Sequence, residues 1–323
     1  MIPLLVDCDP GQDDAIALLL ALASAEVEVL GVTTVAGNQT VDKTTTNALK
    51  VLQLAGRTDL PVAVGAAHPL VRELVVAADA HGESGLDGPS LPEPEASPVA
   101  EHAVGFLARH LLDAERTLTV VALGPLTNIA LLLALRPEAA ERIDRLVLMG
   151  GAIGPGNMTA AAEFNIWIDP EAAERVFASG LELTMVGLDV TNRAVLTRED
   201  AESLRATGPV GTAVAEMLDF YLGFYLNAYE HGGAPIHDAL AMAEIVRPGI
   251  LTTLARPVQI ERIGPGRGRT LVDMRRRIQL PPPNAQVAID VDVTAFRELL
   301  LTRLANFPPP AASDPRSALT GSC

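Results

Sequence analysis

Four carboxylates lie within eight residues near the start of the chain, in the run Asp7-Cys8-Asp9-Pro10-Gly11-Gln12-Asp13-Asp14. Pro10 and Gly11 favour a tight turn between an apolar strand and a helix. Asp7 and Asp9 stand two positions apart on the extended segment and share a face. Asp13 and Asp14 fall in the first helical turn, where exposed amides favour negative charge.

This acidic run predicts a metal site. Helix capping would account for one or two of the four acids, but four carboxylates so close together repel one another and need a counter-charge. The chain has only two lysines, Lys43 and Lys50, and neither lies in the run. A hard divalent cation such as Ca²⁺ or Mg²⁺, which prefers oxygen ligands, is the simplest counter-charge.

An apolar strand that ends in Asp-x-Asp also resembles the nucleophile segment of haloacid-dehalogenase-type phosphotransferases. Those enzymes need a lysine or arginine against the transferred phosphate and typically carry Thr or Val after the second Asp. Here Pro10 follows Asp9, and neither lysine lies late enough in the chain. A phosphatase of this type is therefore the less supported alternative.

The elements that must position these acids alternate between strand and helix through the first two-thirds of the chain. Apolar strands without polar alternation imply an α/β fold with a mostly parallel, open twisted, Rossmann-like sheet and helices on both faces. Such sheets bind ligands beyond the carboxyl ends of their strands. We expect strands at 3–7, 27–35, 61–64, 118–122, 145–149 and 183–186, and helices at 13–23, 41–54, 100–112, 128–135 and 170–178.

The last third predicts a small C-terminal β/α addition. Helices are expected at 198–206, 210–229 and 238–245, strands at 258–261, 270–272 and 287–291, and a closing helix at 294–304. Residues 1–307 are expected to form a single domain. Residues 308–323, rich in Pro, Ala and Ser, are expected to form a disordered tail.

Composition restricts the partners and the compartment. A formal net charge of −16 repels phosphate backbones, so no nucleic-acid polymer is expected as a partner. No apolar run reaches eighteen residues, so no membrane is expected either. The start of the chain has no basic leader, and Cys8 and Cys323 give no disulfide framework. We therefore expect a cytoplasmic protein.

The acidic run followed by Ala15 resembles the Asp-x-Asp-Pro-Gly-x-Asp-Asp-Ala motif of the inosine–uridine-preferring nucleoside hydrolases. The resemblance runs in order and spacing from about residue 3 to 305, and eight segments in register make it specific. The further segments are VTTVAGNQT at 32–40, HGESG at 81–85, GPLTN at 124–128, MGG at 149–151, EFN at 163–165, DPEAA at 169–173 and HD at 237–238.

This resemblance implies hydrolysis of the N-glycosidic bond of ribonucleosides to free base and ribose, with a bound Ca²⁺ ion. Its ligands would be Asp9, Asp14, Asp238 and the main-chain carbonyl of Leu123, where relatives often carry Thr. The ion would bind the attacking water and two ribose hydroxyls. Asp9 would accept the proton of that water as general base.

The resemblance also implies the substrate contacts. The transition state is oxocarbenium-like, with positive charge on the ribose. Asp238 would contact the substrate as well as the ion, His237 would act as acid or hydrogen-bond donor to the leaving base, and His81 would line the base site. Met149 fits a pocket wall better than a chemical role. The ribose hydroxyls would be held by Asp13, Asn38, Asn157, Glu163 and Asn165.

Three tyrosines, Tyr221, Tyr225 and Tyr229, recur every four residues and share one helical face. Such a stripe is typical of a core, although Tyr225 or Tyr229 could cover the base. The two histidines resemble those of the inosine–uridine type, so uridine and inosine are the expected substrates. Relatives are commonly dimers or tetramers, so a homo-dimer or homo-tetramer is expected.

Two further alternatives remain open from the sequence. A non-catalytic, Ca²⁺-dependent nucleoside- or sugar-binding protein would result if the general base were lost, but Asp9, His237 and the other implied site residues are all present. A phosphorylase would need a basic cluster near the ribose ligands. The sequence shows none there.

Overall fold

An eight-stranded sheet forms the centre of the computed structural model, which describes residues 1–228, 232–275 and 279–308. Its strand order is β3-β2-β1-β4-β5-β6-β12-β9. Neighbouring strands are parallel except β12 and β9, which are antiparallel. This confirms the predicted α/β class. The strands are β1 (Ile2–Cys8), β2 (Val27–Thr34), β3 (Val62–Val64), β4 (Leu118–Ala122), β5 (Ile143–Met149), β6 (Leu183–Val186), β9 (Leu251–Arg256) and β12 (Ala285–Val291).

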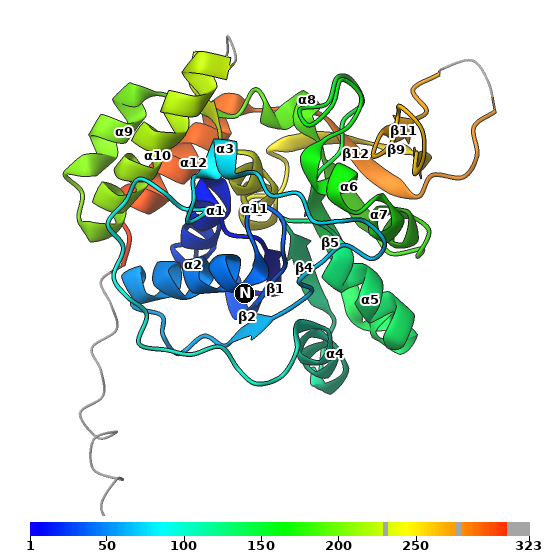
Figure 1. Ribbon diagram of the computed structural model, residues 1–323, viewed down its shortest axis with the longest axis horizontal. Coiled ribbons are helices and arrows are strands. Elements are labelled where there is room, and N and C mark those ends of the chain that lie inside the picture. The colour runs from blue at the N-terminus through cyan, green and yellow to red at the C-terminus, as the bar shows by residue number, and fades with distance from the viewer. Residues whose placement is uncertain (229–231, 276–278, 309–323) are drawn as a thin grey trace, which may run out of the picture.

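Helices cover both faces of the sheet (Figure 1). One layer contains α1 (Gln12–Leu22), α2 (Val41–Leu54), α9 (Arg198–Arg205), α10 (Pro209–Ala228), α11 (His237–Val246) and α12 (Val293–Ala305). The opposite layer contains α4 (Ala103–Asp113), α5 (Thr127–Leu135) and α7 (Pro170–Phe177). Shorter elements are α3 (Ala78–His81), η1 (Pro137–Arg142), α6 (Phe164–Ile168), α8 (Leu188–Thr191), and the strand pairs β7 (Val195–Leu196) with β8 (Ala234–Pro235) and β10 (Val258–Ile260) with β11 (Thr270–Val272).

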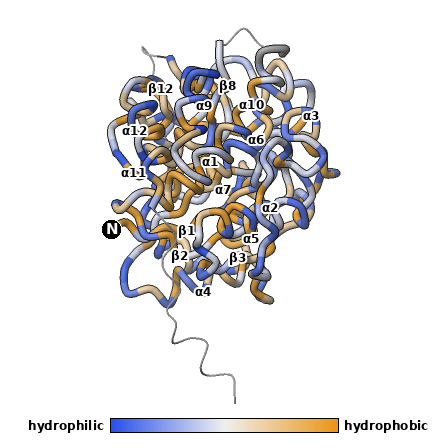
Figure 2. Tube along the Cα trace, turned by 90° about the vertical axis from the view of Figure 1, so that its left-hand side faces the viewer, coloured by the Kyte–Doolittle hydropathy of each residue, from blue (hydrophilic) through white to orange (hydrophobic). Residues whose placement is uncertain are grey.

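Successive residues of the central strands enter two different cores. In β1, Leu4 and Val6 pack with the α1 layer, whereas Leu5 packs with the α4 layer. Side chains alternate across a strand, so a strand with helices on both faces must be apolar at every position. Figure 2 shows hydrophobic colouring along the chain around β1 and β2. Burial of both strand faces is the reason for the unbroken apolar runs in the sequence.

The C-terminal segment differs in detail from the prediction. Strand β12 joins the main sheet beside β6, and β9, which was not predicted from the sequence, forms its antiparallel edge. Only the first residue of β9 is buried, so the strand has no apolar run to reveal it. The expected tail at 308–323 lies outside the described residues, apart from residue 308. The proposal that residues 1–307 form one domain is supported by a single sheet that draws strands from Ile2 to Val291.

Parallel strands place their carboxyl ends along one edge, and the polar loops collect there. The segments after β1, β2, β4 and β5 all leave from this edge. The N-terminus of α1 lies there too, and α11 packs along α1 (Figure 1). Among the described residues, no helix has the length and apolar character needed to cross a membrane.

Candidate active site

Three buried carboxylates meet at the N-termini of α1 and α11. Asp13, Asp14 and Asp238 each offer an oxygen atom, and these atoms all lie within 4.8 Å of one another. Asp13 and Asp14 occupy the first turn of α1, and Asp238 occupies the first turn of α11. Packing of these two helices therefore joins acids from opposite ends of the chain.

The electrostatics of this cluster are unfavourable without a counter-charge. Burial and the neighbouring Asp14 carboxylate raise the pKa of Asp13 to about 8. Burial and the charges of Asp13 and Asp14 raise the pKa of Asp238 well above its usual range. Ionised carboxylates packed so closely need a positive partner inside the cluster.

Asp9 is fully buried beside this cluster, although it is not one of the three mutually close acids. Its Oδ2 accepts a hydrogen bond from the backbone amide of Asn38 at 2.7 Å. Its Oδ1 has no hydrogen-bond partner among the described residues. Burial, followed by the charge of Asp14, raises the pKa of Asp9 well above its usual range. Asp9 Oδ1 is therefore available to bind a cation or to accept a proton.

Two motif glycines bring the backbone against Asp9. A Cβ atom on Gly37 would lie 2.1 Å from Asp9 Oδ2, and one on Gly124 would lie 2.4 Å from Asp9 Oδ1. Only a residue without a side chain fits at either position. These contacts explain the glycines of the 32–40 and 124–128 segments.

Leu123, just after β4, faces the same site. Its backbone N–H donates to the Asp7 carbonyl at 2.8 Å, and its own carbonyl accepts from Asn165 Nδ2 at 2.7 Å. Asn165 Nδ2 also donates to the Met149 carbonyl at 3.2 Å. The donor set that could hold a metal is therefore all oxygen, which suits Ca²⁺ or Mg²⁺. The buried, unpartnered Asp9 Oδ1 and the repelling carboxylates fit such an ion.

Asp7, the fourth acid of the run, faces a different environment. Its Oδ1 accepts from Thr33 Oγ1 at 2.5 Å and from Asn128 Nδ2 at 2.7 Å. Asn128 also donates to the Thr34 carbonyl and accepts from the Ala66 amide. Asp7 therefore ties β1 to β2 and α5 beneath the site, and it does not join the close cluster.

Glu163 caps α6 at the opposite side of the cavity. Its carboxylate accepts backbone N–H groups of Gly151, Asn165 and Ile166. Burial nevertheless raises its pKa to about 7. Asn157 lies nearby, with its Oδ1 accepting the Phe164 amide at 2.9 Å.

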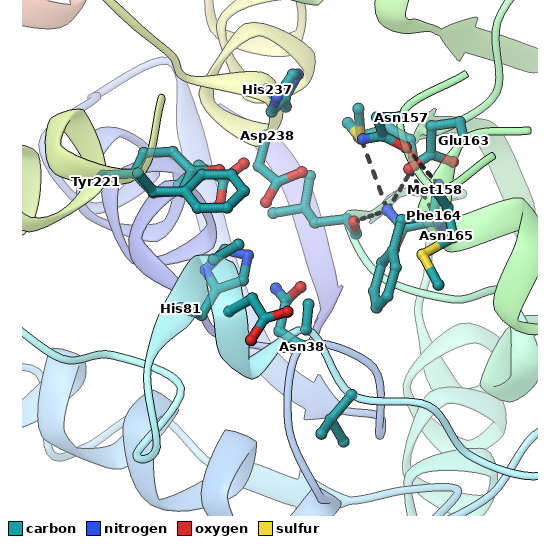
Figure 3. A pocket seen from close by; sticks show the side chains of 18 of the residues that line it. Asn38, His81, Asn157, Met158, Glu163, Phe164, Asn165, Tyr221, His237 and Asp238 are labelled. Carbon is teal, nitrogen blue, oxygen red and sulfur yellow. Dashed lines mark hydrogen bonds between the residues drawn. The ribbon is translucent and has the colours of Figure 1, made fainter. Parts of the chain in front are cut away.

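A cavity of about 400 Å³ opens over these groups, a size suited to a small organic ligand. Figure 3 shows Asn157, Glu163 and Asn165 on one side, Tyr221, His81 and His237 on the other, and Asp238 between them. Asp9 and Asp14 are buried and are not among its lining residues. The expected site residues that line it are Asp13, Asn38, His81, Leu123, Met149, Asn157, Glu163, Asn165, His237 and Asp238.

Several lining residues were not singled out from the sequence. Met158 follows the expected site residue Asn157, and Phe164 lies inside the 163–165 segment, so adjacency was an available signal. The segment from Val75 to Ala80 lies in the long connection between β3 and α4, and the length of that connection was its available signal. Of the tyrosine stripe, Tyr221 and Tyr225 are buried and also line the cavity, whereas Tyr229 lies outside the described residues.

The two cavity histidines have different hydrogen-bond partners. His237 Nδ1 lies 2.7 Å from Thr191 Oγ1, and its Nε2 lies 2.9 Å from the Tyr225 hydroxyl. His81 Nδ1 lies 2.6 Å from Gln12 Oε1. The His81 ring packs 5.5 Å from that of Tyr221, centroid to centroid.

The chain belongs to the inosine-uridine preferring nucleoside hydrolase family, whose model matches residues 4–298. It is therefore a hydrolase that acts on the N-glycosyl bonds of ribonucleosides.

Relatives and solved structures agree with this family. The chain is 51% identical to the pyrimidine-specific ribonucleoside hydrolase RihA of Citrobacter koseri, over 94% of this chain and 98% of that protein. RihA of Escherichia coli is also 51% identical, with the same coverage. Among solved structures, the purine-preferring ribonucleoside hydrolase from Gardnerella vaginalis has a TM-score of 0.89 and 37% identity, over 94% of this chain and 98% of that one.

Proposed function

We propose that this enzyme is a Ca²⁺-dependent ribonucleoside hydrolase that uses Asp9 as general base and releases free base and ribose. The observation that carries the proposal is the convergence of Asp13, Asp14 and Asp238 beneath a ligand-sized cavity. Water attacks C1′, and the C1′–N bond breaks with its electron pair passing to the base. A proton from the water goes to the enzyme, and one from the enzyme or solvent goes to the base.

Asp9, Asp14, Asp238 and the Leu123 carbonyl would hold the ion. Carboxylates and a carbonyl are the oxygen donors that Ca²⁺ prefers, and this ion tolerates irregular geometry. When bound, Ca²⁺ would act as a Lewis acid towards water and the ribose hydroxyls. Asp9 Oδ1, free of protein partners among the described residues, would receive the proton.

The ribose side of the cavity would bind hydroxyls and stabilise developing positive charge. Asn165 Nδ2 donates to two carbonyls, so the Oδ1 atom of Asn165 is the one that can accept a hydrogen bond from a ribose hydroxyl. Asp13, Asn38, Asn157 and Glu163 add further polar atoms around the sugar. Negative and amide oxygens near C1′ would stabilise an oxocarbenium-like transition state.

The leaving base needs a hydrogen-bond donor as it departs. His237 lies in the cavity wall between two hydroxyl groups, those of Thr191 and Tyr225. Hydroxyls both donate and accept, so either ring nitrogen of His237 can carry the proton. This freedom suits a residue that delivers a proton to the base.

A preference for pyrimidine ribonucleosides is part of the proposal. The support is the 51% identity to relatives named pyrimidine-specific, against 37% to the purine-preferring structure. Uridine, which is also an expected substrate from the sequence, is thus the first substrate to test, and inosine is the second. A cytoplasmic location and a homo-dimer or homo-tetramer stay predictions, the latter open to sedimentation analysis.

The test is a substrate panel of uridine, cytidine, inosine, adenosine and guanosine with the purified enzyme. Ribose release should disappear after EDTA treatment and return with Ca²⁺. Asp9→Ala should lower kcat by at least about 100-fold, as loss of a general base does. Binding without turnover by the wild-type protein would instead indicate a nucleoside-binding protein.

Two further outcomes separate the remaining alternatives. An obligatory need for phosphate with ribose 1-phosphate as product would indicate a phosphorylase. Release of phosphate from a phosphomonoester, with Mg²⁺ rather than Ca²⁺ required, would indicate a phosphatase. Either outcome would overturn the proposal.

A further inference from the structure

Gln12 connects the start of α1 to the loop that carries His81. It lies inside the acidic run, is fully buried and is absent from the cavity wall. Its side-chain amide reaches three atoms of the 81–87 segment: His81 Nδ1 and the carbonyls of His81 and Asp87. These contacts fix which end of the amide faces the histidine ring.

The amide has only one orientation that satisfies its partners. Gln12 Nε2 donates to the Asp87 carbonyl at 3.0 Å and more weakly to the His81 carbonyl at 3.4 Å. Both carbonyls accept only, so the NH₂ group must face them. Oε1 then faces His81 Nδ1 at 2.6 Å. Because an amide oxygen accepts only, Nδ1 must carry a hydrogen.

The ring is also packed in place and neutral. A Cβ atom on Gly11 would fall 2.3 Å from His81 Nδ1, so the ring lies directly against that backbone. Burial lowers the pKa of His81 to about 4. Near neutral pH the single ring hydrogen is therefore on Nδ1, and Nε2 has a free lone pair. Among the described residues Nε2 has no hydrogen-bond partner, and His81 lines the cavity.

We propose that Gln12 is a positioning and specificity-determining residue that holds His81 in the Nδ1–H tautomer, so that Nε2 accepts a hydrogen bond from an N–H group of the nucleobase. This inference rests on the proposed function, because it needs a base in that side of the cavity. It selects bases that present a donor, such as N3–H of uracil or the amino group of cytosine.

The same geometry gives the two histidines different roles in the reaction. His81 is held by an acceptor-only amide oxygen, so it recognises the base but has no Nε2 proton to give it. His237 is held between hydroxyls that can switch roles, so it can donate. Base recognition and leaving-group protonation are thereby assigned to different rings.

Nitrogen-15 NMR of imidazole-labelled protein reads the tautomer directly. The chain has six histidines, and His81→Asn identifies the signals of this one. The expected result in the wild type is a protonated Nδ1 and an unprotonated Nε2. In Gln12→Met the two forms should mix. A wild-type spectrum with Nε2–H at His81 would overturn the proposal, and this measurement does not depend on turnover.

Kinetics with uridine and N3-methyluridine test recognition. Gln12→Met should lower kcat/KM for uridine by about 3- to 10-fold, the value of one net hydrogen bond, and that for N3-methyluridine by less than about twofold. Equal losses on both substrates would overturn the proposal, because a merely structural role would affect both.

Gln39→Met is the matched control. Gln39 is buried, and its Nε2 donates to the Gly82 carbonyl of the same loop at 3.3 Å, whereas the His81 ring hydrogen-bonds to Gln12. It should leave the tautomer unchanged and both substrates within about twofold. An equal effect of Gln39→Met would assign the result to loop packing and overturn the proposal. Absence of ribose release by the wild type would refute the proposed function instead, whatever the tautomer.

Discussion

Asp14 and Asp238 place their carboxylates within 4.8 Å of each other although they begin helices from opposite ends of the chain. Each sits in the first turn of its helix, and α1 and α11 pack together. The pair is buried, and each acid contributes to the electrostatics of the other. Two acids in this arrangement are stable together only if a cation or a proton neutralises them.

Asp238→Asn should separate the metal requirement from the fold. In EDTA the variant should be at least as stable as the wild type, because one repelling carboxylate is gone. Ca²⁺ at about 100 times its Kd should stabilise the wild type by about 3 kcal/mol and the variant far less. Activity should fall by about 100-fold or more. Mutation of residues that only hydrogen-bond to metal ligands already lowers metal affinity or activity by about 10- to 100-fold. Thermal unfolding with and without Ca²⁺ measures this, and a variant that gains as much stability from Ca²⁺ as the wild type would contradict it.

Gly124→Ala should damage the site through Asp9. The added methyl group would meet Asp9 Oδ1 at 2.4 Å, so the carboxylate or the 124–128 segment must move. Overpacking of this kind costs about 1–3 kcal/mol of stability, and kcat should fall with it because Asp9 is displaced. Gly105→Ala in α4 is the control, since its methyl would meet only the flexible Glu101 side chain at 3.2 Å. Wild-type kcat in Gly124→Ala would show that Asp9 does not need its present position.

The sheet could be predicted because the burial of each strand is visible in the composition of that strand alone. Strands buried on both faces have to be apolar throughout, and β1, β4 and β6 are visible in the sequence for that reason. Strand β9 could not be found, because it is an edge strand with a single buried residue and its place depends on pairing with β12.

The site was only partly predictable. The acidic run indicates a cation by charge repulsion alone, but nothing local to Asp238 places it against Asp14. That pairing was implied by family resemblance and depends on helix packing. The role of Gln12 needed the structure, because its partner His81 lies on a distant loop and a buried amide has no sequence pattern of its own.

Glu163 should make stability depend on pH in a recognisable direction. Its pKa is raised from 4.5 to about 7 by burial, so the folded state binds more protons than the unfolded state between these values. The stabilising contribution is complete below about pH 4.5 and is lost as pH rises through about 7. Denaturant unfolding of the wild type and Glu163→Gln in EDTA at pH 5 to 8 should show the steeper decline in the wild type. The acids of the metal site titrate in both proteins, so their contribution cancels in the comparison. Parallel plots of the free energy of unfolding against pH for the two proteins would therefore contradict this prediction.

Arg297→Met should weaken the fold without touching the chemistry. Arg297 of α12 donates from both Nη atoms to Asp200, at 2.7 and 2.8 Å, and to the Val195 carbonyl at 3.0 Å. Asp200 also accepts from Thr197 in the capping box of α9, so one buried carboxylate joins α9 to α12. Removing a partly buried arginine from a bidentate pair of this kind should cost about 1–3 kcal/mol.

The exposed pair Arg193–Asp290 supplies the comparison for this last prediction. Both side chains are about half exposed, at 49% and 60%, whereas Asp200 is only 7% exposed. Solvent screens the exposed pair, so Arg193→Met should change the free energy of unfolding by less than about 0.5 kcal/mol. Neither arginine lines the cavity, so kcat/KM should be unchanged in both variants. Equal losses of stability in the two variants would show that burial of Asp200 does not decide the strength of its ion pair.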